Sequence, residues 1–489
     1  ALVGNGASMV TLYYLRRYTT FMQKLFQEIG RDQFSVSKEV YKLFNDLAKS
    51  LDIFNGVVNG SISNVNRRKF TDVLSTAGSD YRTSLYNNGF SGDKTNLPTE
   101  DINSFLNNCL KHIDHSIKIN ERKDHLFHAY NLIKFNENGG ISIRHLYEML
   151  EGQVSVLSSG YLSPPNSVVL LKALRNSSLY RADQQSYILY PNRQLPRFYE
   201  KNIIPTELAN ESNVIKRLLR EDQNNIIDKG VDGKIHFNSK YRNAEILKED
   251  LNRNYSVAET QEVLDIYESI FDHQSFTGRS GTFFKYEGLG SIYWHMVSKL
   301  LLAVNEVYQE AIRSNEDDRI INELKAIYYE IKDGIGTHKK PGLYGAFPTD
   351  PYSHTPAHCG VQQPGMTGQV KEDFISRFGE LGVFVTDGSI SFKPNLLNKS
   401  EYLTKPETFT YYNLNEEKVT QVINEKSLAF TLAQIPIIYT LSDKKQIQIT
   451  YKNDQTDTID GTELNRDIST SIFKRTGTII KIEVYLNQE

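Results

Sequence analysis

The hydrophobic period of this 489-residue chain changes only once, and that change limits what the chain can fold into. From the start to about residue 380, apolar residues recur three and four positions apart, which places them on one buried face of a helix. The strongest stripe runs through Ile292, Met296, Leu300 and Val307, and a second apolar stripe interleaves with it. We therefore expect the helix over this segment to pack on two sides.

After about residue 383, apolar and polar residues alternate instead. The alternation is clearest over 446–451 and 478–485, and it is typical of strands with one buried face. The pattern predicts a mainly α chain, with a helical domain over 1–382 followed by a C-terminal all-β domain over 383–489. The simplest architecture for that second domain is a β-sandwich.

Charge and composition argue against two classes of protein. Lys plus Arg total 56 and Asp plus Glu total 59, a net charge of −3, whereas proteins that bind nucleic acid through its phosphates carry a basic surplus. No apolar run is long enough to predict a membrane span. The chain starts with Ala1 rather than Met, so we expect a processed or excised piece of a longer protein. The cytoplasm is the favoured compartment, with the periplasm as the alternative if a signal segment has been removed.

Three segments, 180–198, 276–294 and 342–374, combine aromatic, planar polar, Gly and Pro residues at a density that core packing does not explain. Sugar rings stack on aromatic faces and their hydroxyls bind planar polar groups, so such segments are typical of a carbohydrate site. The alternative is that they are ordered connections rich in capping residues. The side chains expected to bind substrate are Tyr190, Arg193, Arg279, Tyr286, Trp294, His354, His358, Gln362 and Gln363.

Four carboxylic acids in or next to these segments are candidate catalytic groups. Glu287 is the first candidate for a general acid, because it lies between a tyrosine and a glycine just ahead of the doubly apolar helix, where partial burial would raise its pKa. Asp272 is the second candidate, and Asp183 and Asp350 are candidate bases. The structural alternatives are a capping carboxylate for Glu287 and a C-terminal turn residue for Asp272.

The third segment also raises the question of a metal site. His354 and His358 are four positions apart, with Cys359 next to them, and two histidines at that spacing share one face of a helix. Pro356 lies between them, which argues against a helix there. We therefore expect no metal, and assign these histidines to sugar, phosphate or structural hydrogen bonds.

A run of short motifs near the end of the helical part resembles a known family. Gly365, Met366, Thr367 and Gly368 precede a helix expected at Lys371, and Leu-Gly, Asp-Gly and strand-to-proline steps follow over 381–394. This order resembles the cellobiose-phosphorylase-like family of the (α/α)6-toroid, or six-hairpin, glycosidases. The resemblance implies a toroid for the helical domain. It also implies a phosphate site at Thr367, Gly368 and the adjacent Gln369, where main-chain N–H groups at a helix start bind anions.

The family's acid lies in a Trp-Asn-Asp motif that this sequence lacks, since its only tryptophan is Trp294. The resemblance implies cleavage of a glycosidic bond in an oligosaccharide or polysaccharide with inversion, by hydrolysis or by phosphorolysis. Inorganic phosphate would then be a co-substrate, and no other cofactor is implied. The alternative from another class is a non-catalytic toroid that binds glycans or acts as a scaffold.

Overall fold

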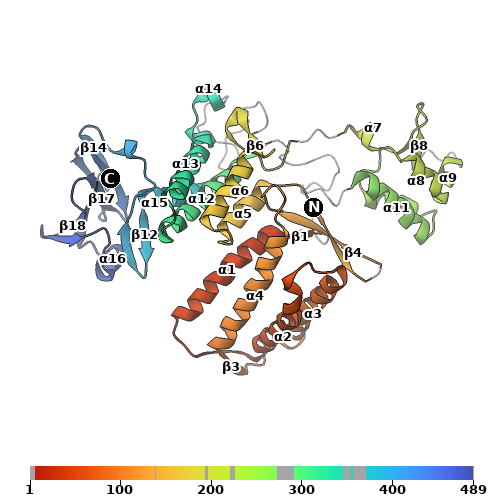
Figure 1. The fold of residues 1–489 in the computed structure, drawn as a ribbon, viewed down its shortest axis with the longest axis horizontal. Helices are drawn as coiled ribbons and strands as arrows, with labels where there is room; N and C mark the ends of the chain where they lie inside the picture. The colour runs from red at the N-terminus through yellow and green to blue at the C-terminus, as the bar shows by residue number, and fades with distance from the viewer. Residues whose placement is uncertain are drawn as a thin grey trace. The chain divides into compact units, whose positions relative to one another are not determined.

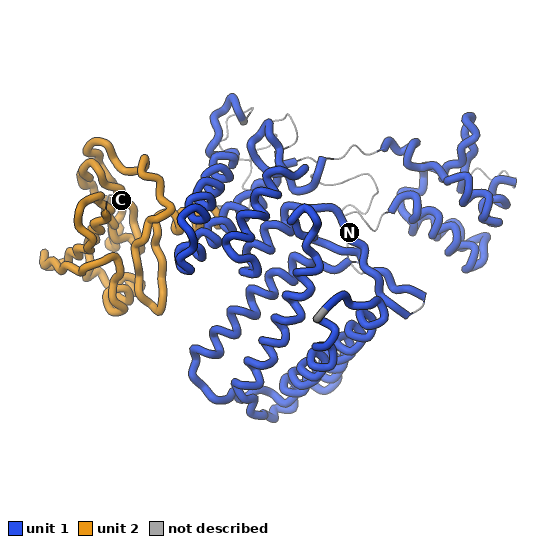
Figure 2. The backbone as a smooth tube through the Cα atoms, in the orientation of Figure 1, with its two compact units in different colours: residues 1–367 blue, residues 368–489 orange. Residues whose placement is uncertain are grey.

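The computed structural model describes residues 6–137, 139–192, 196–220, 226–272, 291–344, 354–355 and 370–487. The chain divides into two compact units, residues 1–367 and 368–489 (Figure 2). Most described helices belong to the first unit, and the larger sheet belongs to the second (Figure 1). This confirms the expected order of a helical part and a β part. The closed toroid and the two-sheet sandwich stay predictions.

Four long helices build the first part of unit 1, and serine side chains begin three of them: Ser8, Ser37 and Ser63 each accept a hydrogen bond from a main-chain N–H of the first turn. Helix α1 packs against α4, and α2 packs against α3. The helices are α1 (Met9–Glu28), α2 (Lys38–Phe54), α3 (Asn64–Asn88) and α4 (Thr99–Ile119). Two small antiparallel sheets accompany them. In the first, β4 (Tyr130–Phe135) pairs with β1 (Gly6–Ser8) on one side and with β5 (Ile141–His145) on the other; in the second, β2 (Gln33–Ser37) pairs with β3 (Lys94–Pro98).

Two helical hairpins follow, and they position the site described below. They are α5 (Leu150–Ser158) with α6 (Pro164–Arg175), and α12 (Trp294–Arg313) with α13 (Asp318–Gly334). Helix α12 contacts α5, α6 and α13. Its buried side chains include Met296 and Leu300 of one predicted stripe, and Val297 and Leu301 of the other. The expected packing of this helix on two sides is confirmed.

Residues between the two hairpins form a small body with its own core. It contains α7 (Phe198–Lys201), α8 (Thr206–Glu211), α9 (Asn213–Arg220), β8 (Ile227–Lys229), β9 (Ile235–Phe237), α10 (Ala244–Leu251) and α11 (Val257–Phe271). Ile215, Phe237, Leu247, Val263 and Tyr267 are among its buried core residues. A cluster of this kind within one stretch of sequence indicates a domain inserted into the helical unit.

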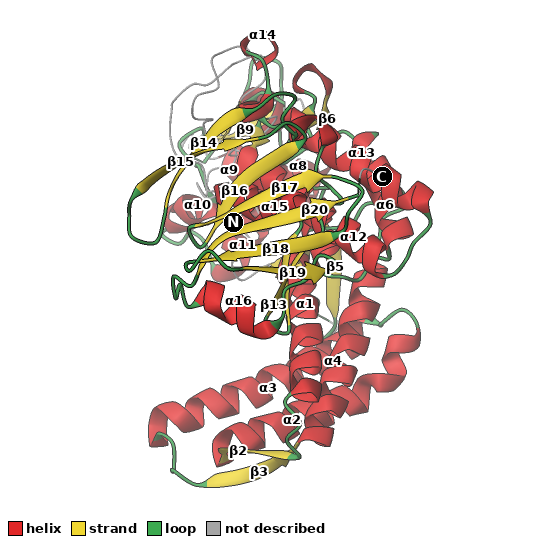
Figure 3. Cartoon of the chain, turned by 90° about the vertical axis from the view of Figure 1, so that its left-hand side faces the viewer, coloured by secondary structure: helices red, strands yellow, loops and turns green. Residues whose placement is uncertain are grey.

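Unit 2 begins with α15 (Val370–Leu381) and is otherwise mainly β. Its five-stranded sheet has the order β16 (Ser427–Leu432), β17 (Ile435–Leu441), β20 (Ile479–Leu486), β18 (Gln446–Tyr451) and β19 (Thr456–Asp460). Strands β17 and β20 are parallel, and the other neighbours are antiparallel (Figure 3). The unit also contains the pairs β12 (Val383–Thr386) with β13 (Ser389–Phe392) and β14 (Glu407–Tyr412) with β15 (Lys418–Ile423), and helix α16 (Arg466–Phe473).

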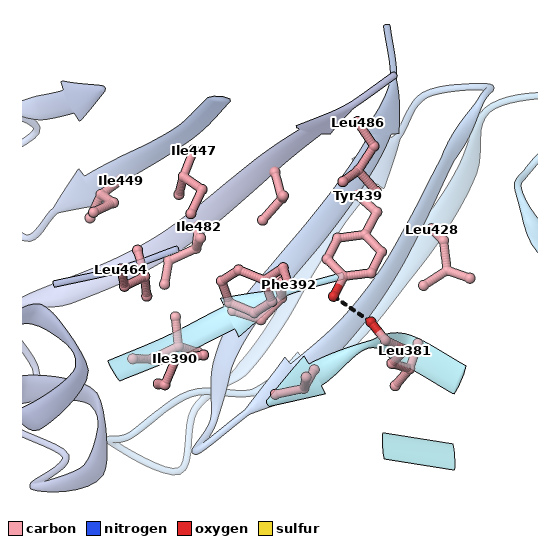
Figure 4. Close-up of a cluster of buried hydrophobic side chains, with 14 of the residues drawn as sticks. Leu381, Ile390, Phe392, Leu428, Tyr439, Ile447, Ile449, Leu464, Ile482 and Leu486 are labelled. Carbon is pink, nitrogen blue, oxygen red and sulfur yellow. Dashed lines mark hydrogen bonds between the residues drawn. The ribbon is translucent and has the colours of Figure 1, made fainter. Parts of the chain in front are cut away.

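The core of unit 2 lies between the sheet and the β12–β13 pair. Figure 4 shows Ile390 and Phe392 of β13 together with Tyr439, Ile447 and Ile482 of the sheet, and all five are buried. The Tyr439 hydroxyl donates a hydrogen bond of 2.6 Å to the main-chain oxygen of Leu381, the last residue of α15. The end of α15 is therefore part of this β core.

Candidate functional site

The described parts of the three polar segments lie next to one another. In the first segment, β6 (Tyr180–Arg181) pairs with β7 (Ser186–Tyr187). The N–H of Leu189 then donates a hydrogen bond of 3.3 Å to the oxygen of Ser291 in the second segment. The second segment continues into β10 (Ile292–Tyr293), which pairs with β11 (His354–Thr355) of the third. Three stretches that are far apart in sequence therefore form one continuous group.

The ends of the two hairpins bring these segments together. Helix α5 begins where the N–H of Leu150 donates to the oxygen of Leu189 at 3.1 Å, and α12 begins at Trp294, directly after β10. Helix α13 ends at Gly334, where a Cβ atom would lie 2.2 Å from the oxygen of Gln185. Glycine at this position is what lets the turn of the first segment approach the end of α13 so closely.

Within that turn, Arg181 and Asp183 form a two-point ion pair. The Nε and Nη2 atoms of Arg181 each donate a hydrogen bond of 2.9 Å to a carboxylate oxygen of Asp183. Arg181 is buried, with 9% of its surface exposed, whereas Asp183 is exposed. The pair fixes a carboxylate in one orientation while leaving it open to solvent, so it can accept hydrogen bonds from a ligand's hydroxyl groups.

A buried lysine lies behind the same turn. Lys339 follows the short helix η4 (Gly336–His338), and its ammonium group donates to the main-chain oxygen of Gln184 and, at 3.3 Å, to Oε1 of the same residue. Its Nζ atom lies 5.2 Å from the ring centroid of Trp294, which is fully buried. The pKa of Lys339 is lowered to about 8, first by burial and then by the charge of Arg181, while the charge of Asp183 opposes both.

Tyr190 marks a second polar group in the first segment. It lies close enough to Tyr130 of β4 to contribute to the raised pKa of that hydroxyl, which is due first to burial and then to the charge of Glu151. The Tyr130 hydroxyl donates a hydrogen bond of 2.7 Å to Oε2 of Glu151, in the first turn of α5. Neither Tyr130 nor Glu151 is predicted from the sequence, because both lie outside the three segments.

Asp272 occupies the end of the inserted body. It is the C-terminal cap of α11 in the left-handed conformation, with φ at 52°. Its two carboxylate oxygens accept hydrogen bonds of 2.6 and 2.9 Å from Arg144 of β5. This is the position of the C-terminal turn residue considered as the alternative. Asp272 would have to leave Arg144 before it could deliver a proton.

The remaining site predictions lie outside the described residues. The main chain of His354 is described and pairs with Tyr293, but its side chain is not described. The others, which are not described at all, are Arg193, Arg279, Tyr286, Glu287, Asp350, His358, Gln362, Gln363, Thr367, Gly368 and Gln369. Among the described residues, no group of three or more His, Cys, Asp or Glu side chains could hold a metal ion, and no helix is long and apolar enough to cross a membrane.

Residues 195–274 match the model of the GH149 phosphorylase insertion domain 2, which is the inserted body between α6 and α12. No curated protein matches the chain. The matched stretch begins within the first polar segment and ends just before the second, so the insertion is flanked in sequence by two of the segments that meet in the candidate site. The match supports a glycoside hydrolase- or phosphorylase-type family for this chain.

Proposed function

We propose that this chain cleaves a glycosidic bond with inversion, and that inorganic phosphate is the attacking group. The observation that carries the proposal is the match of residues 195–274 to a phosphorylase insertion domain. The position of that insertion adds support, because it lies in sequence between two polar segments that contact each other through Leu189 and Ser291. Hydrolysis, with Asp183 or Asp350 activating a water molecule, is the related form of the same chemistry.

In the proposed reaction, a carboxylic acid gives its proton to the glycosidic oxygen as the bond from that oxygen to the anomeric carbon breaks. A phosphate oxygen forms the new bond to the anomeric carbon from the opposite face, which yields a sugar 1-phosphate of inverted configuration. We assign the acid to Glu287, with Asp272 second. Thr367, Gly368 and Gln369 directly precede α15, and main-chain N–H groups at a helix start suit a phosphate.

The described residues supply sugar-binding groups in this scheme. The Arg181–Asp183 pair presents an oriented carboxylate, and Tyr190 adds an aromatic ring near the Tyr130–Glu151 hydrogen bond. Carboxylates accept from sugar hydroxyls, and aromatic faces stack on sugar rings. Trp294, which the sequence suggested as a substrate-binding residue, is fully buried, so in this scheme it supports the group from inside and does not contact the sugar.

The test compares Glu287→Gln, Asp272→Asn and Glu249→Gln in the full chain, with a panel of oligosaccharides that differ in linkage. Glu249 is an exposed residue of α10 and serves as the matched control. Sugar 1-phosphate and reducing ends are measured with and without inorganic phosphate. We expect Glu287→Gln to lose activity by about 10²- to 10⁴-fold, as for loss of a general acid, and the control to keep it.

If Asp272→Asn loses activity and Glu287→Gln keeps it, the general acid would be Asp272. Release of reducing ends without sugar 1-phosphate would show that the reaction is hydrolysis and not phosphorolysis. No product from any oligosaccharide would overturn the proposal and favour a glycan-binding role.

A further inference from the structure

Lys339 is a buried charged group that the proposed reaction does not use. Only 5% of its surface is exposed, and an ammonium group is costly to bury unless polar groups surround it. Gln184 provides two oxygens, the Trp294 ring provides a π face at 5.2 Å, and the nearby charge of Asp183 is favourable. The site therefore bears the cost of burying a charge, which a neutral side chain at this position would avoid.

The contacts of Lys339 and of its partner Gln184 together join all three polar segments. Gln184, which receives its hydrogen bonds, belongs to the first segment, and Trp294 belongs to the second. The side chain of Gln184 in turn donates a hydrogen bond of 3.4 Å to the oxygen of Leu343 in the third. Gln184 is itself buried, so losing the lysine would leave its two oxygens short of a donor in a place that water reaches poorly.

We propose that Lys339 is a positioning residue, whose ammonium group holds the Gln184 turn against Trp294 and so keeps the three segments of the carbohydrate site together. The inference rests on the proposed function for one point alone, which is that the ligand of the site is a carbohydrate. It predicts that removing the ammonium group loosens the first segment, including the oriented Asp183. Lys339 itself need not touch substrate.

The single tryptophan of the chain gives a direct measurement of this contact, since Trp294 is the only source of tryptophan emission. A charge close to the indole ring alters its excited state, so emission should follow the protonation of Lys339. We expect the emission of the full chain to change between pH 6.5 and 9.5 with a midpoint near 8, the lowered pKa of this buried lysine. The described charged groups that act on it are Arg181 and Asp183.

Three variants make the titration decisive. Lys339→Met removes the titrating group, and Lys339→Arg keeps a charge that does not titrate in this range; both should abolish the transition. Lys340→Met is the matched control, because Lys340 is exposed, and it should titrate like the wild type. A transition that survives in both Lys339 variants, or that is absent from the wild type, would overturn the inference.

Hydrogen exchange tests the positioning role without any assay of activity. In Lys339→Met, the main-chain amides of residues 185–189 and 292–293 should exchange at least tenfold faster than in the wild type, whereas those of β17 and β20 should not change. Equal exchange of the first set in both proteins would contradict the role. Because neither measurement needs turnover, an inactive wild type would defeat the proposed function and leave the result for Lys339 intact.

Discussion

Arg181 and Asp183, two positions apart in one turn, hold each other by two hydrogen bonds of 2.9 Å, although the first residue is buried and the second is exposed. The carboxylate is a partner that compensates the burial of the guanidinium group. The exposed carboxylate depends on the guanidinium for its orientation. A change to either residue should therefore affect both the fold and the site.

Asp183→Asn should lower the free energy of unfolding by about 1.5 to 3 kcal/mol, because one charge-assisted hydrogen bond to a buried guanidinium is lost. Asp333→Asn is the control, since Asp333 is exposed on the last turn of α13, and it should change stability by less than about 0.5 kcal/mol. Urea unfolding measures both. Equal stability of the two variants would show that the pair contributes little.

Gly334→Ala should destabilise the chain by about 1 to 3 kcal/mol, because the added methyl group would lie 2.2 Å from the oxygen of Gln185, and neither main chain can easily move. Gly342→Ala is the control, since among the described residues nothing beyond its chain neighbours and its own helix backbone lies within 4 Å of the position that its Cβ would take. The control should change stability by no more than about 0.5 kcal/mol. Thermal unfolding of both variants would decide, and a stable Gly334→Ala would mean that the turn does not approach α13 so closely.

The pH dependence of stability follows from Lys339. Its pKa is about 8 in the folded chain and 10.5 as the reference value, so the unfolded chain binds more protons between these two values. The contribution of this group to stability is therefore least favourable below pH 8, and it improves as the pH rises from 8 towards 10.5.

The free energy of unfolding of the wild type, minus that of Lys339→Met, should rise between pH 7.5 and 9.5. Urea unfolding at these two pH values measures it. A difference that does not vary with pH, or that moves the other way, would contradict the assignment.

Tyr439→Phe tests the core of unit 2. The hydroxyl donates a 2.6 Å hydrogen bond to the oxygen of Leu381, and its loss leaves a buried carbonyl without that donor, so we expect a cost of about 1 to 3 kcal/mol. Tyr412→Phe, at a residue with 59% of its surface exposed, should be neutral within about 0.5 kcal/mol. Urea unfolding followed by circular dichroism compares them. A Tyr439→Phe variant as stable as the wild type would show that this hydrogen bond contributes little to stability.

Sequence periodicity predicted the elements whose buried face follows from the spacing of apolar residues within one stretch of sequence. The two stripes of α12 are an example, because residues of both are buried and the helix contacts α5, α6 and α13. Lys339 could not be predicted in this way. It stands beside the exposed Lys340, and its hydrogen-bond partner is Gln184, 155 positions earlier in the chain.

The candidate site shows the same limit. The density of aromatic and planar polar residues indicated the three segments, and their described parts do meet. Partners that depend on tertiary approach were missed, as with Arg144 for Asp272 and Glu151 for Tyr130. No local pattern distinguishes such residues from ordinary surface charges.

The most direct test of the central claim is the anomeric configuration of the first product, followed by proton nuclear magnetic resonance while the full chain acts on an oligosaccharide in the presence of inorganic phosphate. The account predicts a sugar 1-phosphate whose configuration is opposite to that of the bond cleaved, with none formed when phosphate is left out. A product of retained configuration, or no sugar 1-phosphate from any oligosaccharide of the panel, would contradict it.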